Sequence, residues 1–372
     1  MGWTQPYRVL SLDGGGMRGV YTASYLGAAG RAFALRRGGD QLDIGKAFNL
    51  IVGASTGAIV GAALAAGIGL DRVAHLYRAH GRAIFRRRVP SQWWDLPGDL
   101  VERHEALEHG EQAMKAALTE AFGDMTLGQV FAERGIAMAV PAVEMSQHRS
   151  WVFKTPHLVG ETNNRDNNTT LVDVCLASSA APIFRSLARV PRTDGAANSV
   201  NYFADGGLWG NNPVLIALTE ALRASEPGRP IEILCMGSCP RPAGEQVTDA
   251  KRHRDLLDWR FGADAATLSI DAQEFAFDNI ARMLKGRLDR PCEIVRFPAD
   301  KVPAALVPYL GLDDARDESM NALIAQALAD ADMLNALCAD TTSVIAKLLC
   351  GAFEAAPVLS NPARAAELHI TP

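Results

Sequence analysis

The sequence lacks several features that would assign a protein to a specialised class. Its six cysteines are scattered without a Cys-x-x-Cys pair, and no histidine lies near the one close pair, Cys235 and Cys239. A zinc site is therefore not expected, and buried reduced thiols are the usual state of cysteines in apolar runs. Residues 1–6 contain neither the basic nor the apolar segment of a signal peptide. These absences favour a protein of the reducing cytoplasm that holds no metal and no cofactor.

The net charge argues against a nucleic-acid-binding protein, and the hydropathy pattern argues against a membrane-spanning one. The 372 residues are 48% hydrophobic and 21% charged, with a net charge of −5, which gives no whole-protein reason to bind nucleic acid. Residues 47–70 carry no charged side chain and are long enough to cross a bilayer. Because they are dominated by Gly and Ala, and a strand followed by a sharp turn accounts for them, no membrane span is expected.

The clearest chemical pattern lies in residues 49–60, where an apolar strand runs into a Gly-x-Ser-x-Gly turn and then into a helix. Ser55 lies at the tip, and Gly53 and Gly57 leave room for a tight turn. Hydrolases present a serine nucleophile above a sheet in this way. The pattern is short enough to occur by chance in a Gly-rich chain, so its neighbours must decide.

A glycine-rich loop follows the strand expected at residues 7–12 and precedes a helix expected from about residue 20 to 35. It comprises Gly14, Gly15, Gly16, Met17 and Arg18. At a helix N-terminus, the backbone N–H groups of such a loop can face an anion, including the oxyanion that forms during acyl transfer. With a hydrolytic nucleophile a short way downstream, we interpret the loop as an oxyanion hole.

The same loop has a second formal interpretation, because Gly14, Gly16 and Gly19 match the Gly-x-Gly-x-x-Gly pattern of dinucleotide-binding proteins. That pattern requires an acidic residue at the end of a second strand about 20 residues later. Asp40 and Asp43 lie instead in a loop. The dinucleotide interpretation is therefore the weaker one.

A serine nucleophile needs a base, which is normally a histidine oriented by a carboxylate. None of the eight histidines follows a strand end after Ser55 in a convincing position. Asp205 is the better candidate, because it ends an expected strand at residues 201–204 and precedes two glycines. Taken alone, Asp205 would more often belong to an ordinary Asp-Gly turn.

Alternation of strands and helices through residue 237 predicts an α/β core with a mainly parallel sheet, followed by a mainly helical C-terminal part. We expect one compact unit, with a core of residues 1–245 and a helical part of residues 246–372 packed on it. The other helices are expected at 71–88, 111–122, 171–180, 213–223, 319–337 and 342–353, and the other strands at 136–143, 151–153, 231–236 and 293–297.

A basic and aromatic segment follows the helix expected at residues 71–88. It contains Arg86, Arg87, Arg88, Trp93 and Trp94. Indoles favour the membrane interface and cations favour anionic headgroups, so these residues are candidates for membrane contact or for a lid. A solvated basic helix end followed by tryptophans packed on the core explains the segment equally well.

Three motifs in this order, at residues 13–19, 53–57 and 205–207, resemble those of the patatin-like phospholipases. The similarity covers roughly residues 7–237, and the segments 178–182 and 211–213 are also similar to the family. It implies a three-layer α/β/α fold and a lipid acyl hydrolase with a Ser-Asp dyad. By this resemblance Ser55 is the nucleophile, Asp205 the base and loop 14–18 the oxyanion hole.

The overall build also resembles bacterial patatin-like effectors that a cyclic oligonucleotide switches on during phage infection, although no nucleotide-binding motif carries this step. It implies a cytoplasmic enzyme that acts on phospholipids at the inner face of the membrane through peripheral contact. It is also compatible with a homo-oligomer. The alternatives are a constitutive housekeeping lipase or thioesterase, and a non-catalytic lipid- or nucleotide-binding module on the same fold.

Overall fold

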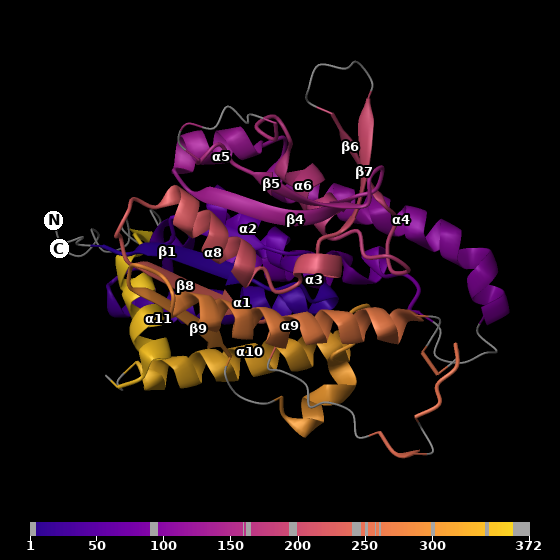
Figure 1. Cartoon of the computed structure of the whole chain (residues 1–372). Coiled ribbons are helices and arrows are strands. Elements are labelled where there is room, and N and C mark those ends of the chain that lie inside the picture. The colour runs from indigo at the N-terminus through magenta and orange to yellow at the C-terminus, as the bar shows by residue number, and fades with distance from the viewer. Residues whose placement is uncertain are drawn as a thin grey trace, which may run out of the picture.

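The computed structural model describes residues 5–89, 96–158, 160, 165–192, 199–239, 247–249, 252–256, 258–259, 262–298, 302–338 and 342–359. Figure 1 shows the arrangement of the elements. The strands are β1 (Tyr7–Leu12), β2 (Gln41–Leu42), β3 (Leu50–Gly53), β4 (Ala137–Glu144), β5 (Arg149–Lys154), β6 (Ala188–Pro191), β7 (Val200–Asp205), β8 (Ile231–Met236), β9 (Cys292–Phe297) and β10 (Val358–Leu359). The α-helices are α1 (Gly19–Arg36), α2 (Thr56–Ala66), α3 (Leu70–Ile84), α4 (Leu96–Phe122), α5 (Leu127–Arg134), α6 (Leu171–Ser178), α7 (Gly207–Gly210), α8 (Val214–Ala224), α9 (Ala263–Lys285), α10 (Asp317–Leu337) and α11 (Val344–Ala355). The 3₁₀ helices are η1 (Gly16–Arg18), η2 (Ile44–Ala47) and η6 (Ala304–Tyr309).

The main sheet is mixed and mainly parallel, with the order β6-β7-β4-β3-β1-β8-β9 and with β5 also paired to β4. Strands β4, β3, β1, β8 and β9 run parallel to one another. Strands β5, β6 and β7 pair in antiparallel fashion. Together with the helices on both faces described next, this arrangement confirms the predicted α/β fold class.

The residues of the central strands alternate between two apolar cores, one on each face of the sheet. Leu10 and Leu12 of β1 pack with α1, α2, α3, α4, α6, α10 and α11. Tyr7 and Val9 of the same strand pack with α8 and α9 on the other face. Figure 1 shows where these two helices lie beside the sheet. Since successive side chains of a strand point to opposite faces, helices cover β1 on both sides, and the result is a three-layer α/β/α fold.

The uncharged segment 47–70 contains β3 and α2, and most of its residues are buried in this core. Residues 56–65 of α2 are all buried, so the helix has no face that needs a polar residue. Among the described residues, no helix is both long and apolar enough to cross a bilayer.

The sheet brings the predicted site segments to one edge. The glycine-rich loop follows β1, and Ser55 follows the parallel neighbour β3. β3 pairs with residues 137–139 of β4, whereas β7 pairs antiparallel with residues 142–144 of the same strand. The carboxyl ends of β3 and β7 therefore meet beside β4, and Asp205 approaches Ser55 from the opposite direction rather than from a parallel neighbour.

Most predicted elements are present, but several bounds and strands differ. α3 ends at Ile84 instead of residue 88, and α4 begins at Leu96, well before the expected residue 111. β2, β6 and β10 were not predicted, because each has only two to four residues. β9 pairs with β8 across the proposed boundary at residue 245, so the C-terminal part adds a strand to the sheet as well as helices.

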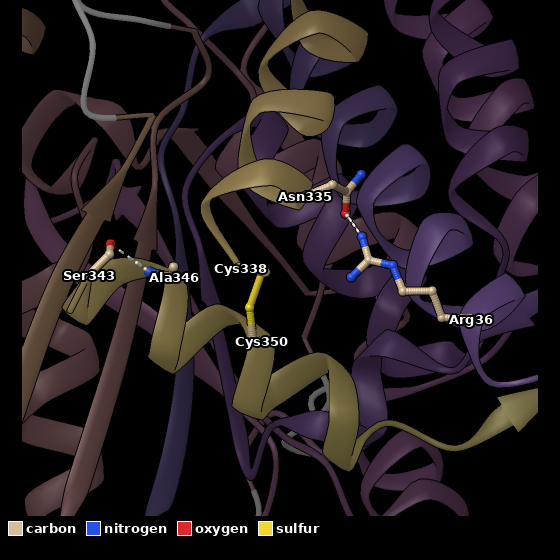
Figure 2. The surroundings of a disulfide bond; sticks show 6 residues. All are labelled: Arg36, Asn335, Cys338, Ser343, Ala346 and Cys350. Carbon is tan, nitrogen blue, oxygen red and sulfur yellow. Dashed lines mark hydrogen bonds between the residues drawn. A yellow bond between two sulfur atoms is a disulfide. The ribbon is translucent and has the colours of Figure 1, made fainter. Parts of the chain in front are cut away.

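Two cysteines depart from the expected reduced state. Cys338, at the end of α10, forms a disulfide with Cys350 of α11 (Figure 2). The fold brings the two Cα atoms to 6.4 Å, and a separation of 12 residues in the sequence does not indicate this proximity. Arg36 donates a hydrogen bond of 3.1 Å to Asn335 and links α1 to α10 nearby. The other cysteines, Cys175, Cys235, Cys239 and Cys292, are free and buried as expected.

Candidate active site

Ser55 occupies a strained turn between β3 and α2. Its φ of 52° and ψ of −120° lie in a region that residues with a side chain rarely adopt. Gly57 permits the turn, since a Cβ there would lie 2.3 Å from the carbonyl oxygen of Leu12. The N–H of Ser55 donates to Oγ of Ser178 at 2.9 Å, and that hydroxyl donates to the carbonyl of Pro141 at 2.7 Å. The turn is thus fixed by close packing and by a buried hydroxyl.

The hydroxyl of Ser55 donates a hydrogen bond to a buried carboxylate. Its Oγ lies 2.9 Å from Oδ2 of Asp205, which is 5% exposed. The other carboxylate oxygen accepts the N–H of Gly207 at 2.6 Å, and the N–H of Asp205 itself donates to the carbonyl of Ala180 at 2.9 Å. Both carboxylate oxygens are held, so the oxygen facing Ser55 is oriented before any substrate binds.

The environment of Asp205 raises the pKa of its carboxyl group toward neutral pH. Burial raises the pKa of Asp205 from 3.8 to about 6, although the Gly207 N–H, the Ser55 hydroxyl and the charge of Arg185 each act to lower it. A carboxyl group with a pKa of about 6 is ionised at neutral pH and is a stronger proton acceptor than an exposed aspartate. Asp205 can therefore accept the proton of the serine.

The glycine-rich loop leaves two backbone donors free. The N–H of Gly14 donates to Asn211 (3.0 Å), that of Met17 to Leu312 (2.9 Å) and that of Arg18 to Gly15 (3.1 Å). Within the described part of the chain, the N–H groups of Gly15 and Gly16 have no acceptor. Of the five loop residues predicted to form the oxyanion hole, these two have backbone donors available for a ligand.

Side chains from distant parts of the sequence hold this loop in place. The hydroxyl of Ser238 and the side-chain amide of Asn211 both donate to the carbonyl of Gly14, at 3.2 and 3.4 Å. Arg18, predicted as part of the oxyanion hole, donates from Nε to the carbonyl of Gly15 at 3.3 Å. Its guanidinium thus supports the fold of the loop.

A buried ion cluster anchors Asp13, the residue that precedes the loop. Arg296 of β9 contacts Asp13 at 2.5 Å and Asp278 of α9 at 2.7 Å. Asp278 also accepts a hydrogen bond of 2.8 Å from Asn212, which precedes α8. The cluster connects the glycine loop to α9 and β9, both of which belong to the C-terminal part of the chain.

Ser55 and Asp205 line a cavity of about 100 Å³. The wall is mainly apolar and includes Met17, Ile84, Phe85, Met114, Phe184 and Ile270. No histidine is among its described lining residues. The buried guanidinium of Arg185 also lines it. The cavity suits an acyl chain whose carbonyl lies at the serine.

The described residues contain no group of three His, Cys, Asp or Glu side chains that could hold a metal ion.

The basic and aromatic segment lies only partly within the described residues. Arg86 is exposed. Arg87 forms an ion pair with Glu102, and Arg88 lies 3.8 Å from Asp314. Trp93 and Trp94 fall outside the described residues. Membrane contact by this segment stays a prediction, and two of its three arginines already face carboxylates of the protein.

Several residues of the site carry no recognisable signal in the sequence. Ser178 lies in the segment 178–182 that is similar to the family, but nothing in the sequence indicates that its hydroxyl bonds the nucleophile turn directly. Arg185 and Arg296 are single arginines outside any motif, and only the folded chain places them near residues 13–16, 55 and 205.

Comparison with known proteins gives consistent results. The family model described as "Patatin-like phospholipase" matches residues 10–218. A "cGAMP-activated phospholipase" of Pseudomonas aeruginosa is 34% identical over 75% of this chain and 76% of its own length. A protein of the same description from Vibrio cholerae is 32% identical over 58% of each chain. A "cUMP-AMP-activated phospholipase" of Escherichia coli is 30% identical over 58% of each chain.

Proposed function

The chain belongs to the patatin-like phospholipase family of carboxylic ester hydrolases, and we propose that it cleaves acyl esters of membrane phospholipids through a dyad of Ser55 and Asp205. The observation that carries this proposal is the hydrogen bond of 2.9 Å between Ser55 Oγ and the buried carboxylate of Asp205. The free N–H groups of Gly15 and Gly16 and the apolar cavity support it.

In the acylation step, Ser55 Oγ attacks the ester carbonyl carbon while its proton passes to Asp205 Oδ2. The carbonyl oxygen becomes an oxyanion that accepts hydrogen bonds from the N–H groups of Gly15 and Gly16. When the tetrahedral intermediate collapses, the bond to the alcohol oxygen breaks. Asp205 returns the proton to that oxygen, and the lysolipid leaves as an alcohol.

In the deacylation step, water replaces the alcohol. Asp205 accepts a proton from the water as its oxygen attacks the acyl-serine carbonyl, and the same two N–H groups stabilise the second oxyanion. Collapse breaks the bond to Ser55 Oγ, which regains a proton from Asp205, and the fatty acid is released. Each turnover consumes one water molecule and returns Ser55 and Asp205 to their starting protonation states.

We also propose that a cyclic dinucleotide activates the enzyme. The support is the description of the related proteins as activated by cGAMP or by cUMP-AMP. The motive is physical, since a phospholipase inside a cell would degrade its host's membrane unless it were restrained. Thr267 and Ile270 of α9, together with Leu312, form part of the cavity wall, which supports a role of the C-terminal part in this activation.

A phospholipid assay with the purified chain and with Ser55→Ala tests both proposals. Vesicles of defined composition are incubated with cGAMP, with cUMP-AMP or with no nucleotide, and released fatty acid is measured. We expect low basal release, an increase with one cyclic dinucleotide, and none from Ser55→Ala. Full release of fatty acid without nucleotide, unchanged by either cyclic dinucleotide, would indicate a constitutive lipase. Binding of lipid or nucleotide without release would favour a binding module.

A further inference from the structure

One charged side chain in the cavity has no role in the mechanism above. Arg185 lies in the loop between α6 and β6 and is 8% exposed. Its guanidinium makes no hydrogen bond or ion pair with any residue that the structure describes, and its Nη1 is fully buried without a partner. It lines the same cavity as Ser55 and Asp205.

Two other buried arginines show what a structural arginine looks like in this protein. Arg296 contacts two buried carboxylates, those of Asp13 and Asp278. Arg18 donates to the carbonyl of Gly15. Burying a cation without such partners is unfavourable, because the group loses its hydration and gains nothing in return. The stability of the fold therefore does not explain why an arginine is buried at position 185.

The charge on Arg185 persists at neutral pH. Burial lowers the pKa of Arg185 to about 10, while the charges of Glu111 and Asp205 act in the opposite direction. These carboxylates act at a distance, without a hydrogen bond or ion pair to the guanidinium among the described residues. The donors of a charged guanidinium thus remain available inside the cavity.

The loop that carries Arg185 is held in an unusual conformation. Ile183, two residues earlier, has a φ of +76°, which is strained for a β-branched residue. Its carbonyl accepts a hydrogen bond of 3.1 Å from Arg103 of α4, and the N–H of Arg185 donates to Ala181 at 2.8 Å. These contacts with the backbone of the loop hold Arg185 in position, and the guanidinium of Arg185 takes part in none of them.

We propose that Arg185 binds the phosphodiester of the phospholipid substrate and so selects phosphate-bearing esters over neutral ones. A guanidinium donates two parallel hydrogen bonds to phosphate oxygens, and a phosphate brought into this cavity would satisfy donors that the protein leaves free. The phosphodiester lies on the glycerol backbone close to the scissile ester. Arg185 can then hold the headgroup while Ser55 faces the acyl carbonyl. This inference rests on the proposed phospholipase function.

Two soluble substrates with the same acyl chains test the proposal. Dihexanoylphosphatidylcholine carries the phosphodiester, and 1,2-dihexanoylglycerol does not. Arg185→Met removes the charge at similar length, Arg185→Lys retains a charge, and Arg189→Met alters an exposed arginine of β6 as the matched control. Each variant is compared with the unaltered chain for kcat/KM on both substrates, with the activating nucleotide present if one is found.

We expect Arg185→Met to lose about 10- to 100-fold in kcat/KM on the phosphatidylcholine, the size of a lost charge-assisted contact, and less than about 3-fold on the glycerol diester. Arg185→Lys should recover part of the loss, and Arg189→Met should match the unaltered chain. Equal losses on both substrates, with the acid limb of the pH profile moved upward, would show that Arg185 acts only through Asp205 and would overturn the proposal. No loss on either substrate would overturn it as well.

A binding measurement separates this inference from the proposed function. In the Ser55→Ala background, calorimetry compares the affinity for dihexanoylphosphatidylcholine and for cGAMP with and without Arg185→Met. Loss of lipid binding alone supports the proposal, even if the unaltered chain hydrolyses neither ester and the proposed function fails. Loss of cGAMP binding alone would assign Arg185 to the nucleotide and overturn the inference.

Discussion

Replacing Asp205 by asparagine should abolish ester hydrolysis and yet stabilise the folded protein. The carboxylate is fully buried, and its pKa rises from 3.8 to about 6 on folding. Because the folded pKa lies above the unfolded one, the unfolded chain loses this proton first. Ionisation therefore destabilises the folded state as the pH rises. A shift of this size corresponds to about 3 kcal/mol once both states are ionised.

The size of this destabilisation depends on pH, and the pH range over which it changes identifies Asp205 as its source. Below about pH 3 both states hold the proton and the destabilisation vanishes; it reaches about 1.5 kcal/mol at pH 5 and about 3 kcal/mol at pH 8. Asparagine keeps the shape and the acceptor for Gly207 but does not ionise. The unfolding free energy of Asp205→Asn minus that of the unaltered chain should thus grow by about 1.5 kcal/mol between pH 5 and pH 8.

Urea denaturation of both proteins at the two pH values measures this difference, and comparing the proteins at each pH cancels the titration of all groups that they share. In parallel, kcat/KM of the unaltered chain should fall about tenfold per pH unit below about pH 6, because the base becomes protonated. A stability difference that stays constant with pH would refute the assignment of a raised pKa to Asp205.

Four further predictions concern other parts of the site. Ser55→Ala should lose as much turnover as the double variant with Asp205→Asn, because the two residues act as a unit; a double variant far slower than either single one would contradict this. Gly16→Ala should lower kcat about 10²- to 10³-fold with little change in KM, since φ is +57° there and a Cβ would lie 2.2 Å from the Leu312 carbonyl; an unchanged kcat would exclude an oxyanion role. Arg296→Met should lower the unfolding free energy by about 3–5 kcal/mol in denaturant titrations, because it leaves buried carboxylates unpaired; a loss below about 1 kcal/mol would show that the cluster is dispensable. Replacing Trp93 and Trp94 by alanine should reduce activity on vesicles more than on a soluble ester, and vesicle binding should weaken with salt, which screens exposed charges beyond about 10 Å at 0.1 M; equal losses on both substrates would favour packed tryptophans.

The parts of the fold predicted from the sequence are those that local patterns determine. Largely apolar runs such as residues 7–12 and 231–236, each with a charged residue at its second position, mark strands buried on both faces, and both are interior strands of the sheet. The turn at Ser55 and the strand end at Asp205 were predicted because backbone geometry there requires glycines nearby. Short edge strands such as β6 bury few side chains and leave little pattern, so they were missed.

What the sequence could not provide is the set of contacts between distant segments. Arg296 contacts Asp13 across 283 residues, and nothing around either residue indicates the partner. Cys338 and Cys350 pair because the folded chain brings their Cα atoms to 6.4 Å, which their spacing in the sequence does not reveal. Arg185 stands in an ordinary loop sequence, and only the absence of partners in the folded chain distinguishes it.

Labelling with a fluorophosphonate tests the catalytic dyad most directly. The reagent forms a bond between phosphorus and an activated serine oxygen, releases fluoride, and leaves an adduct that peptide mass spectrometry can locate. With the activating nucleotide present if one is required, we expect a single adduct at Ser55, which Asp205→Asn slows by orders of magnitude. Ester hydrolysis that continues with Ser55 unlabelled, or an adduct at a different residue, would contradict a mechanism built on Ser55 and Asp205.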